Sequence, residues 1–178
     1  LAKGRRVLDL FGYQGAFALA ALRGGATSAL VVDESEAALQ LATAGAQANG
    51  LAGLTTQVGN VFDVLRTERE AGRQYDLIVL DPPAFAKSRR EVEGAERGYR
   101  DLSRLALRLL APHGLLVTCT CSHHLVPPRF EEIVRQAAAG LPFRVVLRQR
   151  LGAGQDHPVV ITHPESEYLK VLVRQRQD

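Results

Sequence analysis

Residues 75–85 read YDLIVLDPPAF, and this stretch decides the fold class. From Tyr75 to Asp81 the residues are almost all apolar, which is typical of a strand that is covered on both faces of a parallel sheet. The strand must end there, because Pro82 and Pro83 lack backbone N–H donors and favour an extended exit. The stretch therefore predicts a central strand with a polar tip at its carboxyl end.

Short apolar runs alternate with helix-period segments on both sides of this stretch. The predicted strands are Arg5–Leu10, Ser28–Asp33, Leu54–Val58, Tyr75–Asp81, Gly114–Thr120, Phe143–Arg150 and Glu167–Val173. The predicted helices are Ala16–Arg23, Glu34–Ala48, Val61–Ala71, Gly94–Leu110 and Arg129–Ala139. The alternation predicts an α/β fold with a mostly parallel, doubly wound, seven-stranded sheet. No helix separates the last two strands, so we expect one of them to run antiparallel at the edge.

The composition fits one globular domain over residues 1–178, with 46% hydrophobic and 23% charged residues. The apolar runs are too short to span a bilayer and no export leader opens the sequence, so we expect a cytoplasmic protein without membrane contact. Cys119 and Cys121 lie one residue apart on one predicted strand and point to opposite faces, which disfavours a disulfide between them. The net charge of +3 is weak evidence for a nucleic-acid partner.

Polar and special residues gather at the predicted carboxyl ends of the strands. These tips are Asp9 with the turn that follows it, Asp33, Asn60, Asp81 and residues 121–124. Because ligands of open parallel sheets bind beyond these ends, the tips predict one shared site.

The turn after the first strand carries Gly12 and Gly15, which let the backbone approach a ligand closely. It is neither the Gly-x-Gly-x-x-Gly turn that binds dinucleotides nor a P-loop. A nucleoside with an amino-acid-like tail fits such a turn better than a diphosphate does, which speaks against a nicotinamide dehydrogenase.

Two further tips suit a nucleoside. Asp33 can accept hydrogen bonds from both hydroxyls of a ribose. Its alternative role is to cap the next helix, but Ser35 can do this equally well and leave the acid free. The side chain of Asn60 can meet an adenine edge, and Phe85 is available to stack on a flat ring.

Several motifs occur in a fixed order between residues 4 and 170: VLDLFGYQGAF, VVDES, YDLIVLDPPAFAKS, RGYRDL, CTCSHH, QDHPV and PESEYLK. Together they resemble the S-adenosylmethionine-dependent 23S ribosomal RNA cytosine-C5 methyltransferase family. The resemblance implies a class I methyltransferase Rossmann-like fold, S-adenosyl-L-methionine as cofactor, S-adenosyl-L-homocysteine as product and 23S ribosomal RNA as partner. It also implies an N-terminal PUA-type domain that is missing here. Since the sequence has no Met and starts with Leu1, we expect residues 1–178 to be the catalytic fragment of a longer chain.

The resemblance also implies roles for individual positions. The implied cofactor-binding residues are Asp9, Phe11, Gly12, Tyr13, Gly15, Asp33, Ser35, Asn60, Val61, Asp81 and Pro82. Asn60 stands where the family usually has an acid that contacts adenine, so we expect weaker binding at that point. The implied substrate-binding residues are Pro83, Phe85, Lys87, Arg89, Arg90 and Arg97.

Cys121 and Asp81 are the expected catalytic residues. A thiolate that adds to carbon 6 of cytosine makes carbon 5 enamine-like, so that it can attack a methyl donor. Cys121 would stand beside Asp81 if the fourth and fifth strands are neighbours, and Asp81 would then hold the base edge. In one alternative, Cys121 is a buried thiol that only fills space in the core, a role that suits Cys119 better. In the other, zinc is bound by Cys119, Cys121, His123 and His124, although their spacing is a weak signal.

Other functions stay open. An RNA methyltransferase that makes 7-methylguanosine or an N-methylated base needs no thiol, and a non-catalytic RNA- or nucleotide-binding module needs no catalytic residues. Arg100, Arg104 and Arg108 share one predicted helix face, which is either solvated or, beside the site, binds RNA phosphates. We expect no bound metal. The oligomeric state stays open, with a homodimer as one option.

Overall fold

The protein folds around one seven-stranded sheet, seen in a computed structural model that describes residues 1–85 and 89–178, the side chains of Arg89 and Pro164 excepted. The strands are β1 (Arg6–Leu10), β2 (Ser28–Asp33), β3 (Leu54–Val58), β4 (Tyr75–Leu80), β5 (Leu110–Thr120), β6 (Arg144–Leu151) and β7 (Lys170–Gln177). The α-helices are α1 (Ala16–Arg23), α2 (Glu36–Ala48), α3 (Val61–Glu70), α4 (Val92–Arg108) and α5 (Pro127–Ala138). Two short 3-10 helices, η1 (Arg89–Glu91) and η2 (Pro164–Ser166), lie in the connections.

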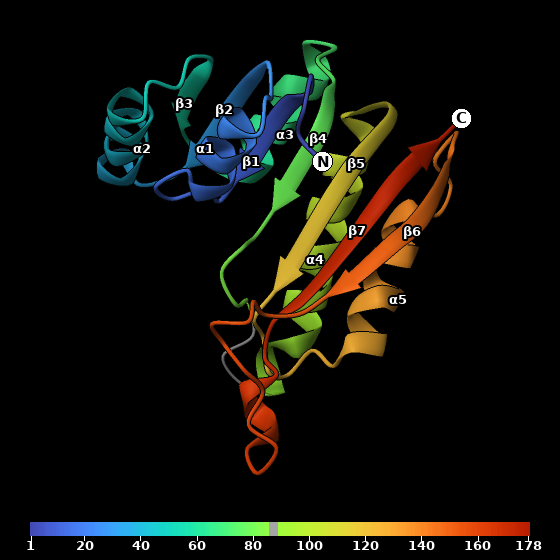
Figure 1. Ribbon diagram of the computed structural model, residues 1–178. Helices are drawn as coiled ribbons and strands as arrows, with labels where there is room; N and C mark the ends of the chain where they lie inside the picture. Colours follow the sequence, from blue (N-terminus) through green and yellow to red (C-terminus); the bar gives the residue numbers. More distant parts are fainter. Residues whose placement is uncertain (86–88) are drawn as a thin grey trace.

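The strand order is β3-β2-β1-β4-β5-β7-β6 (Figure 1). Strands β1 to β5 pair in parallel, whereas β7 pairs antiparallel with both β5 and β6. This confirms the predicted α/β class and the mostly parallel sheet. The antiparallel strand is β7, which lies between β5 and the edge strand β6.

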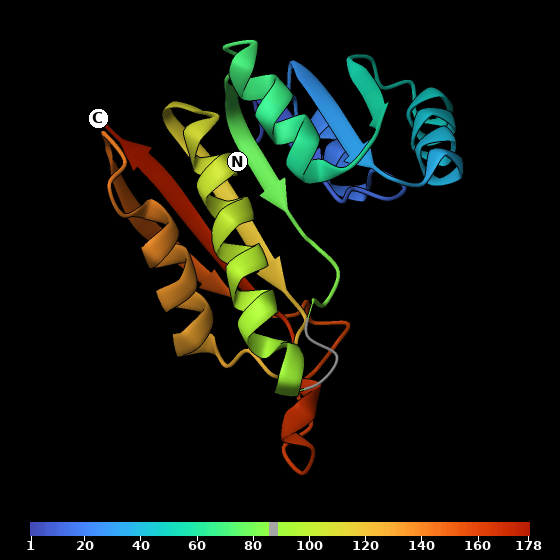
Figure 2. The ribbon, with the colours of Figure 1, turned by 180° about the vertical axis from the view of Figure 1, so that it is seen from behind.

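Helices cover the two faces of the sheet unequally. α3, α4 and α5 lie on one face (Figure 2), where Leu102 and Leu107 pack with Ile78 and Leu80 of the central strand. α1 and α2 cover the opposite face at β1 and β2, where Leu77 joins the second core. The central strand β4 is thus buried on both faces, as its apolar sequence predicts.

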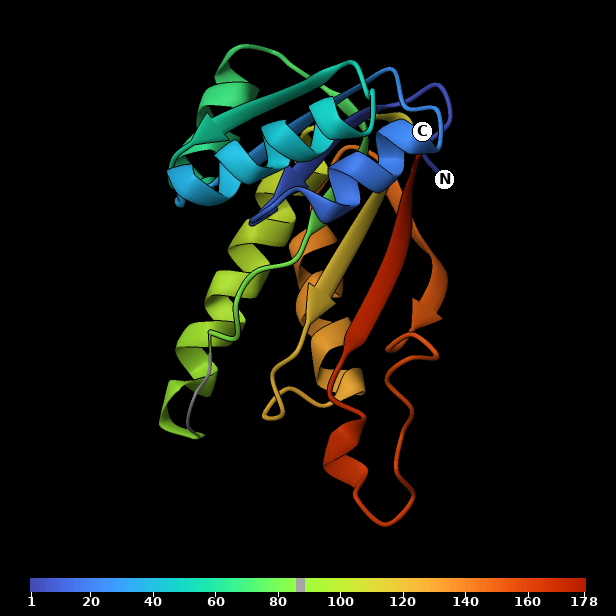
Figure 3. The same ribbon diagram turned by 60° about the vertical axis from the view of Figure 1, so that its left-hand side comes forward.

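The parallel strands all end at one edge of the sheet, and the loop of residues 152–169 protrudes beyond that edge (Figure 3). The end of β6 and the start of β7 lie at the same edge, because β7 runs opposite to its neighbours. None of the described helices is long and apolar enough to cross a membrane.

Most predicted bounds differ from the structure by one to four residues, and three of these differences have a clear cause. Helix α2 begins two residues later, because Ser35 caps it with its side chain. Strand β5 begins at Leu110 instead of Gly114, because Leu110 pairs with Tyr75 before an irregularity in the register. The end of strand β7, at Gln177, differs from the predicted one because its last residues are polar and show no apolar strand pattern in the sequence. One of these polar residues, Arg174, is buried and donates to Thr118 Oγ1 at 2.8 Å.

Candidate active site

The turn between β1 and α1 has an unusual backbone. Phe11, Tyr13 and Gly15 have φ angles of 59°, 47° and 71°, a left-handed region that residues with a Cβ rarely adopt. At Phe11 and Tyr13 this strain costs about 1–3 kcal/mol each, and such strain persists mostly at functional sites. At Gly12, a Cβ would lie 2.5 Å from Val31 Cγ1, so only glycine fits there.

Asp9 lies beneath this turn and is fully buried. Its Oδ2 accepts the backbone N–H of Ala18 at 3.0 Å, whereas its Oδ1 has no hydrogen-bond partner among the described residues. Burial raises the pKa of Asp9 to about 7, and the nearby carboxylates of Asp81 and Asp33 add to this rise. Because buried polar atoms are rarely left unpaired, the free oxygen favours a ligand that brings a donor or a positive charge.

Asp33, at the tip of β2, holds two loops in place. Its Oδ2 accepts the N–H of Tyr13 and its Oδ1 accepts the N–H of Ser35, both at 2.9 Å. Ser35 caps α2, as the sequence allows, by accepting from Ala38 N–H at 3.3 Å. Ser35 thus takes the capping role, as predicted, although both oxygens of Asp33 accept backbone N–H groups of the neighbouring loops. Each oxygen keeps a second lone pair for a ligand hydroxyl.

Asn60 caps α3 by accepting the N–H of Phe62 at 3.0 Å. Its amide Nδ2 donates to Glu34 Oε1 at 3.0 Å, which brings the tips of β2 and β3 together. Val61 is buried in the main core, so its side chain does not border the site, whereas Phe62 does.

These tips surround a hollow of about 540 Å³, which we call the cofactor-sized hollow. Its lining residues are Phe11, Asp33, Glu34, Asn60, Phe62, Asp81, Pro82, Pro83 and Phe85. Five other predicted cofactor-binding residues are not part of this lining but lie in the neighbouring strand, turn and loop: Asp9, Gly12, Tyr13, Gly15 and Ser35. Glu34 was not among the predicted site residues, although it directly follows Asp33 in the sequence.

Cys121 follows the end of β5. The pairing of β4 with β5 confirms that their tips are neighbours, with Leu80 opposite Thr118. Cys121 is a free, half-buried thiol. Burial is the main cause that raises the pKa of Tyr99, but Cys121 and Asp81 both contribute, which places both near this hydroxyl.

Cys119 differs from Cys121. It is 3% exposed, and burial raises its pKa to about 12, with smaller contributions from Asp81, Asp9 and Cys121. A buried thiol of this kind is inert, which agrees with the filler role expected of Cys119. In the described part of the chain, no three His, Cys, Asp or Glu side chains are placed to hold a metal ion, so the zinc alternative gains no support.

The predicted substrate side is only partly described. Arg90 and Arg97 line a second, open hollow of about 620 Å³ beside Phe62 and Phe85. Arg97 also lies 4.0 Å from Glu93 in an exposed ion pair. Lys87 lies outside the described residues, as does the side chain of Arg89.

Two of the three arginines proposed to share an RNA-binding face have other positions. Arg104 donates to the carbonyls of Ala137 and Ala139, at 3.2 and 2.7 Å, and thereby supplies hydrogen-bond donors to backbone carbonyls at the C-terminal end of α5. Arg108 ends α4 just before β5 begins, at the edge of the sheet opposite the site. The expectation that both lie beside the site is therefore wrong, because α4 runs away from it.

Comparison with known proteins gives concordant matches. The family model of the S-adenosylmethionine-dependent methyltransferases matches residues 1–164. Ribosomal RNA large subunit methyltransferase I of Aeromonas hydrophila is 43% identical over 173 residues, which are 96% of this chain and 44% of the relative. The chain thus spans less than half the length of this curated relative.

Solved structures agree with these matches. The crystal structure of SMU.776, a putative methyltransferase complexed with SAH, superposes with a TM-score of 0.87 at 29% identity and covers 98% of this chain and 46% of that chain. A putative SAM-dependent methyltransferase from Streptococcus mutans has a TM-score of 0.86 at 29% identity, over 98% of this chain and 45% of that chain.

Proposed function

We propose that this chain, which belongs to the S-adenosylmethionine-dependent methyltransferase family, is the catalytic domain of an RNA methyltransferase that forms 5-methylcytidine in large-subunit ribosomal RNA. The observation that carries the proposal is the free Cys121 thiol, half-buried one residue past β5 and beside the strand tip that carries Asp81.

The residues of the hollow fit the cofactor. S-adenosylmethionine carries a sulfonium and an ammonium group, and the site supplies carboxylates at Asp33 and Glu34. The unpaired Oδ1 of Asp9 and the missing Cβ at Gly12 leave a polar contact and space beside the turn. The aromatic rings of Phe11, Phe62 and Phe85 supply apolar surface for a flat heterocycle.

The cofactor supplies an electrophilic methyl group. The protein must supply the activation of cytosine, because carbon 5 of an aromatic ring is a poor nucleophile. Cys121 as thiolate forms a bond from Sγ to carbon 6, and the π electrons of the carbon 5–carbon 6 bond move toward carbon 5 and the ring nitrogen N3. Once carbon 5 has gained the methyl group, a base takes its proton, the electron pair of that C–H bond re-forms the carbon 5–carbon 6 double bond, and Sγ leaves carbon 6 as thiolate.

Asp81 is placed to assist this addition. Burial raises its pKa, so its carboxyl group retains a proton more readily than an exposed aspartate does. A protonated carboxyl group at the base edge can donate a hydrogen bond to N3, where negative charge develops.

The test is nucleoside mass spectrometry on unmodified large-subunit ribosomal RNA after incubation with S-adenosylmethionine and the full-length protein that carries this chain. We expect 5-methylcytidine from the wild type and none from Cys121→Ala. Cys119→Ala is the matched control, because it removes a neighbouring thiol that is buried in the strand, and it should retain the product.

Two outcomes would contradict the proposal. A 7-methylguanosine or N-methylated product that persists in Cys121→Ala would show a methyltransferase without a covalent adduct. Binding of RNA and S-adenosylhomocysteine without any methylated nucleoside would show a binding module.

A further inference from the structure

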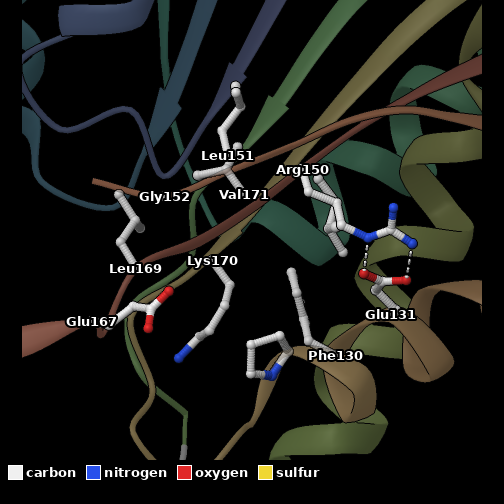
Figure 4. A pocket seen from close by; sticks show the side chains of 11 residues that line it. Phe130, Glu131, Arg150, Leu151, Gly152, Glu167, Leu169, Lys170 and Val171 are labelled. Atoms are coloured by element: carbon white, nitrogen blue, oxygen red, sulfur yellow. Dashed lines mark hydrogen bonds and ion pairs between the residues drawn. The ribbon is translucent and has the colours of Figure 1, made fainter. Parts of the chain in front are cut away.

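A separate hollow opens on the other side of Cys121, at the same edge of the sheet. It measures about 270 Å³ and lies between α5, the end of β6 and the start of β7 (Figure 4). Strand β5, which leads into Cys121, has β4 on one side and β7 on the other. The Cys121 loop therefore lies between the tip of β4, which borders the cofactor-sized hollow, and the start of β7, which borders this one.

The walls of this hollow suit a flat ring with polar edges. Leu151 and Leu169 supply apolar surface, with Leu151 51% exposed, and the buried Phe130 closes the bottom of the hollow. Its volume lies just below the range of about 300–1,000 Å³ that is typical of pockets for drug-sized ligands, so it suits a single nucleobase.

Charged groups line two sides of the hollow. Figure 4 shows the ion pair of Arg150 and Glu131 on one side, and the carboxylate of Glu167 and the ammonium of Lys170 on the other. Glu131 and Arg150 bind each other through two hydrogen bonds, so they are already paired. No ion pair among the described residues engages Glu167, which leaves its carboxylate available.

Lys170 connects this hollow to the catalytic loop. Its Nζ donates to the carbonyl of Ser122 at 2.7 Å, next to Cys121. Burial lowers the pKa of Lys170, and Cys121 and Glu167 oppose this change, so both lie near the ammonium. The ring of Tyr168 lies 6.1 Å from that of His123, which joins the same loop to the segment before β7.

We propose that this hollow receives a second nucleobase of the RNA, from a nucleotide that flanks the methylated one, and that it selects guanine or uracil. Both bases present a lactam edge, in which an N–H lies beside a carbonyl. The N–H donates to the Glu167 carboxylate and the carbonyl accepts from Lys170 Nζ, while the ring packs against the side chains of Leu151 and Leu169. The inference rests on the proposed RNA substrate and adds where a neighbouring base is recognised.

The experiment measures saturation-transfer NMR signals of the four ribonucleoside 5′-monophosphates on the full-length protein, with the cofactor site filled by S-adenosylhomocysteine. Gly152→Leu fills the hollow, because Gly152 lines it and a Cβ there meets only Leu169 O, at 3.8 Å. Glu167→Gln removes the acceptor charge. Glu165→Gln is the matched control, since Glu165 lies on the same exposed segment and does not line the hollow.

We expect GMP and UMP to bind more strongly than AMP and CMP. Their affinities should fall about fivefold or more in Gly152→Leu and Glu167→Gln, which corresponds to roughly 1 kcal/mol, and stay unchanged in Glu165→Gln. Equal signals in the wild type and both test variants, or no nucleotide binding at all, would overturn the proposal.

The same preparations separate this proposal from the proposed function. Formation of 5-methylcytidine with an unchanged KM for ribosomal RNA in both test variants would keep the function and remove the second base site. Nucleotide binding that depends on Gly152 and Glu167, without 5-methylcytidine, would keep the base site and remove the proposed product.

Discussion

The carboxylate of Asp33 accepts the backbone N–H of Tyr13 at 2.9 Å, which ties the turn after β1 to the tip of β2. The same carboxylate accepts the N–H of Ser35 with its other oxygen. One side chain thus fixes two loops that border the cofactor-sized hollow, and it holds Tyr13 at its positive φ.

Asp33→Asn should weaken cofactor binding. The amide keeps one acceptor oxygen and replaces the other with an –NH₂ group, so one backbone N–H loses its partner, at a cost of about 1–3 kcal/mol. We expect the affinity for S-adenosylhomocysteine to fall about tenfold or more, as measured by isothermal titration calorimetry. Glu36→Gln on the exposed first turn of α2 is the control and should change little. An unchanged affinity in Asp33→Asn would show that this carboxylate does not shape the site.

Gly12→Ala should destabilise the fold through crowding. The new Cβ would lie 2.5 Å from Val31 Cγ1 and 3.0 Å from Asp9 Cγ, and overpacking of this kind costs about 1–3 kcal/mol. Urea denaturation measures the loss, and the same substitution should cost less in a Val31→Ala background, where the clash is relieved.

Gly94→Ala is the matched control for this substitution. Gly94 lies in α4 and a Cβ there meets nothing within 4 Å, so alanine should stabilise the helix by about 0.5–1 kcal/mol. Equal effects of the two substitutions would contradict the crowding argument.

The hydrophobic period was sufficient to predict most of the fold. Strands β2 and β3 and helix α1 have the predicted bounds, because each has an uninterrupted pattern and a clear stop. The hydrophobic period does not predict the end of β7, because Arg174 and Gln175 interrupt the apolar pattern although the strand continues to Gln177. Only the partner strand β5 and the contact of Arg174 with Thr118 explain why a buried arginine is tolerated there.

Sequence places residues at strand tips but does not determine their side-chain partners. The order of strands and helices predicts that Asp33, Asn60 and Asp81 meet at one edge, and all three line the hollow. The bond between Asn60 and Glu34 joins the tips of two strands, so it depends on their spacing in the sheet. The role of Arg104 at the end of α5 likewise depends on the packing of two helices.

Asp9 should make stability depend on pH. Burial raises its pKa from 3.8 to about 7, so the folded protein holds this proton more tightly than the unfolded chain does. This contribution to stability is fully present below about pH 3.8 and is lost as the pH rises through 7. Asp9→Asn stays neutral and can still accept from Ala18 N–H, so it should become more stable than the wild type by up to roughly 4 kcal/mol at pH 8.

Urea denaturation of both proteins at pH 5, 6, 7 and 8 checks this expectation. The difference between their free energies of unfolding should grow up to about pH 7 and then level off. Asp101→Asn, at an exposed position on α4, should show no such trend. A difference that is constant with pH would mean that Asp9 does not titrate in this range.

Asn60→Asp restores the acid that the resemblance leads us to expect at this position, but it should not improve cofactor binding alone. Aspartate can still accept from Phe62 N–H and cap α3, since both residues are good N-caps. The bond from Nδ2 to Glu34 Oε1 is lost, however, and two carboxylates then face each other. Glu34→Gln combined with Asn60→Asp removes this repulsion and reverses the donor and acceptor, so the double variant should bind S-adenosylhomocysteine about two- to fivefold more tightly than Asn60→Asp does.

Calorimetric titration of both single variants and the double variant measures the coupling. Tighter binding by Asn60→Asp alone, with no further gain from Glu34→Gln, would show that Glu34 does not oppose an acid at position 60, and that the contact between the two tips has no part in cofactor affinity.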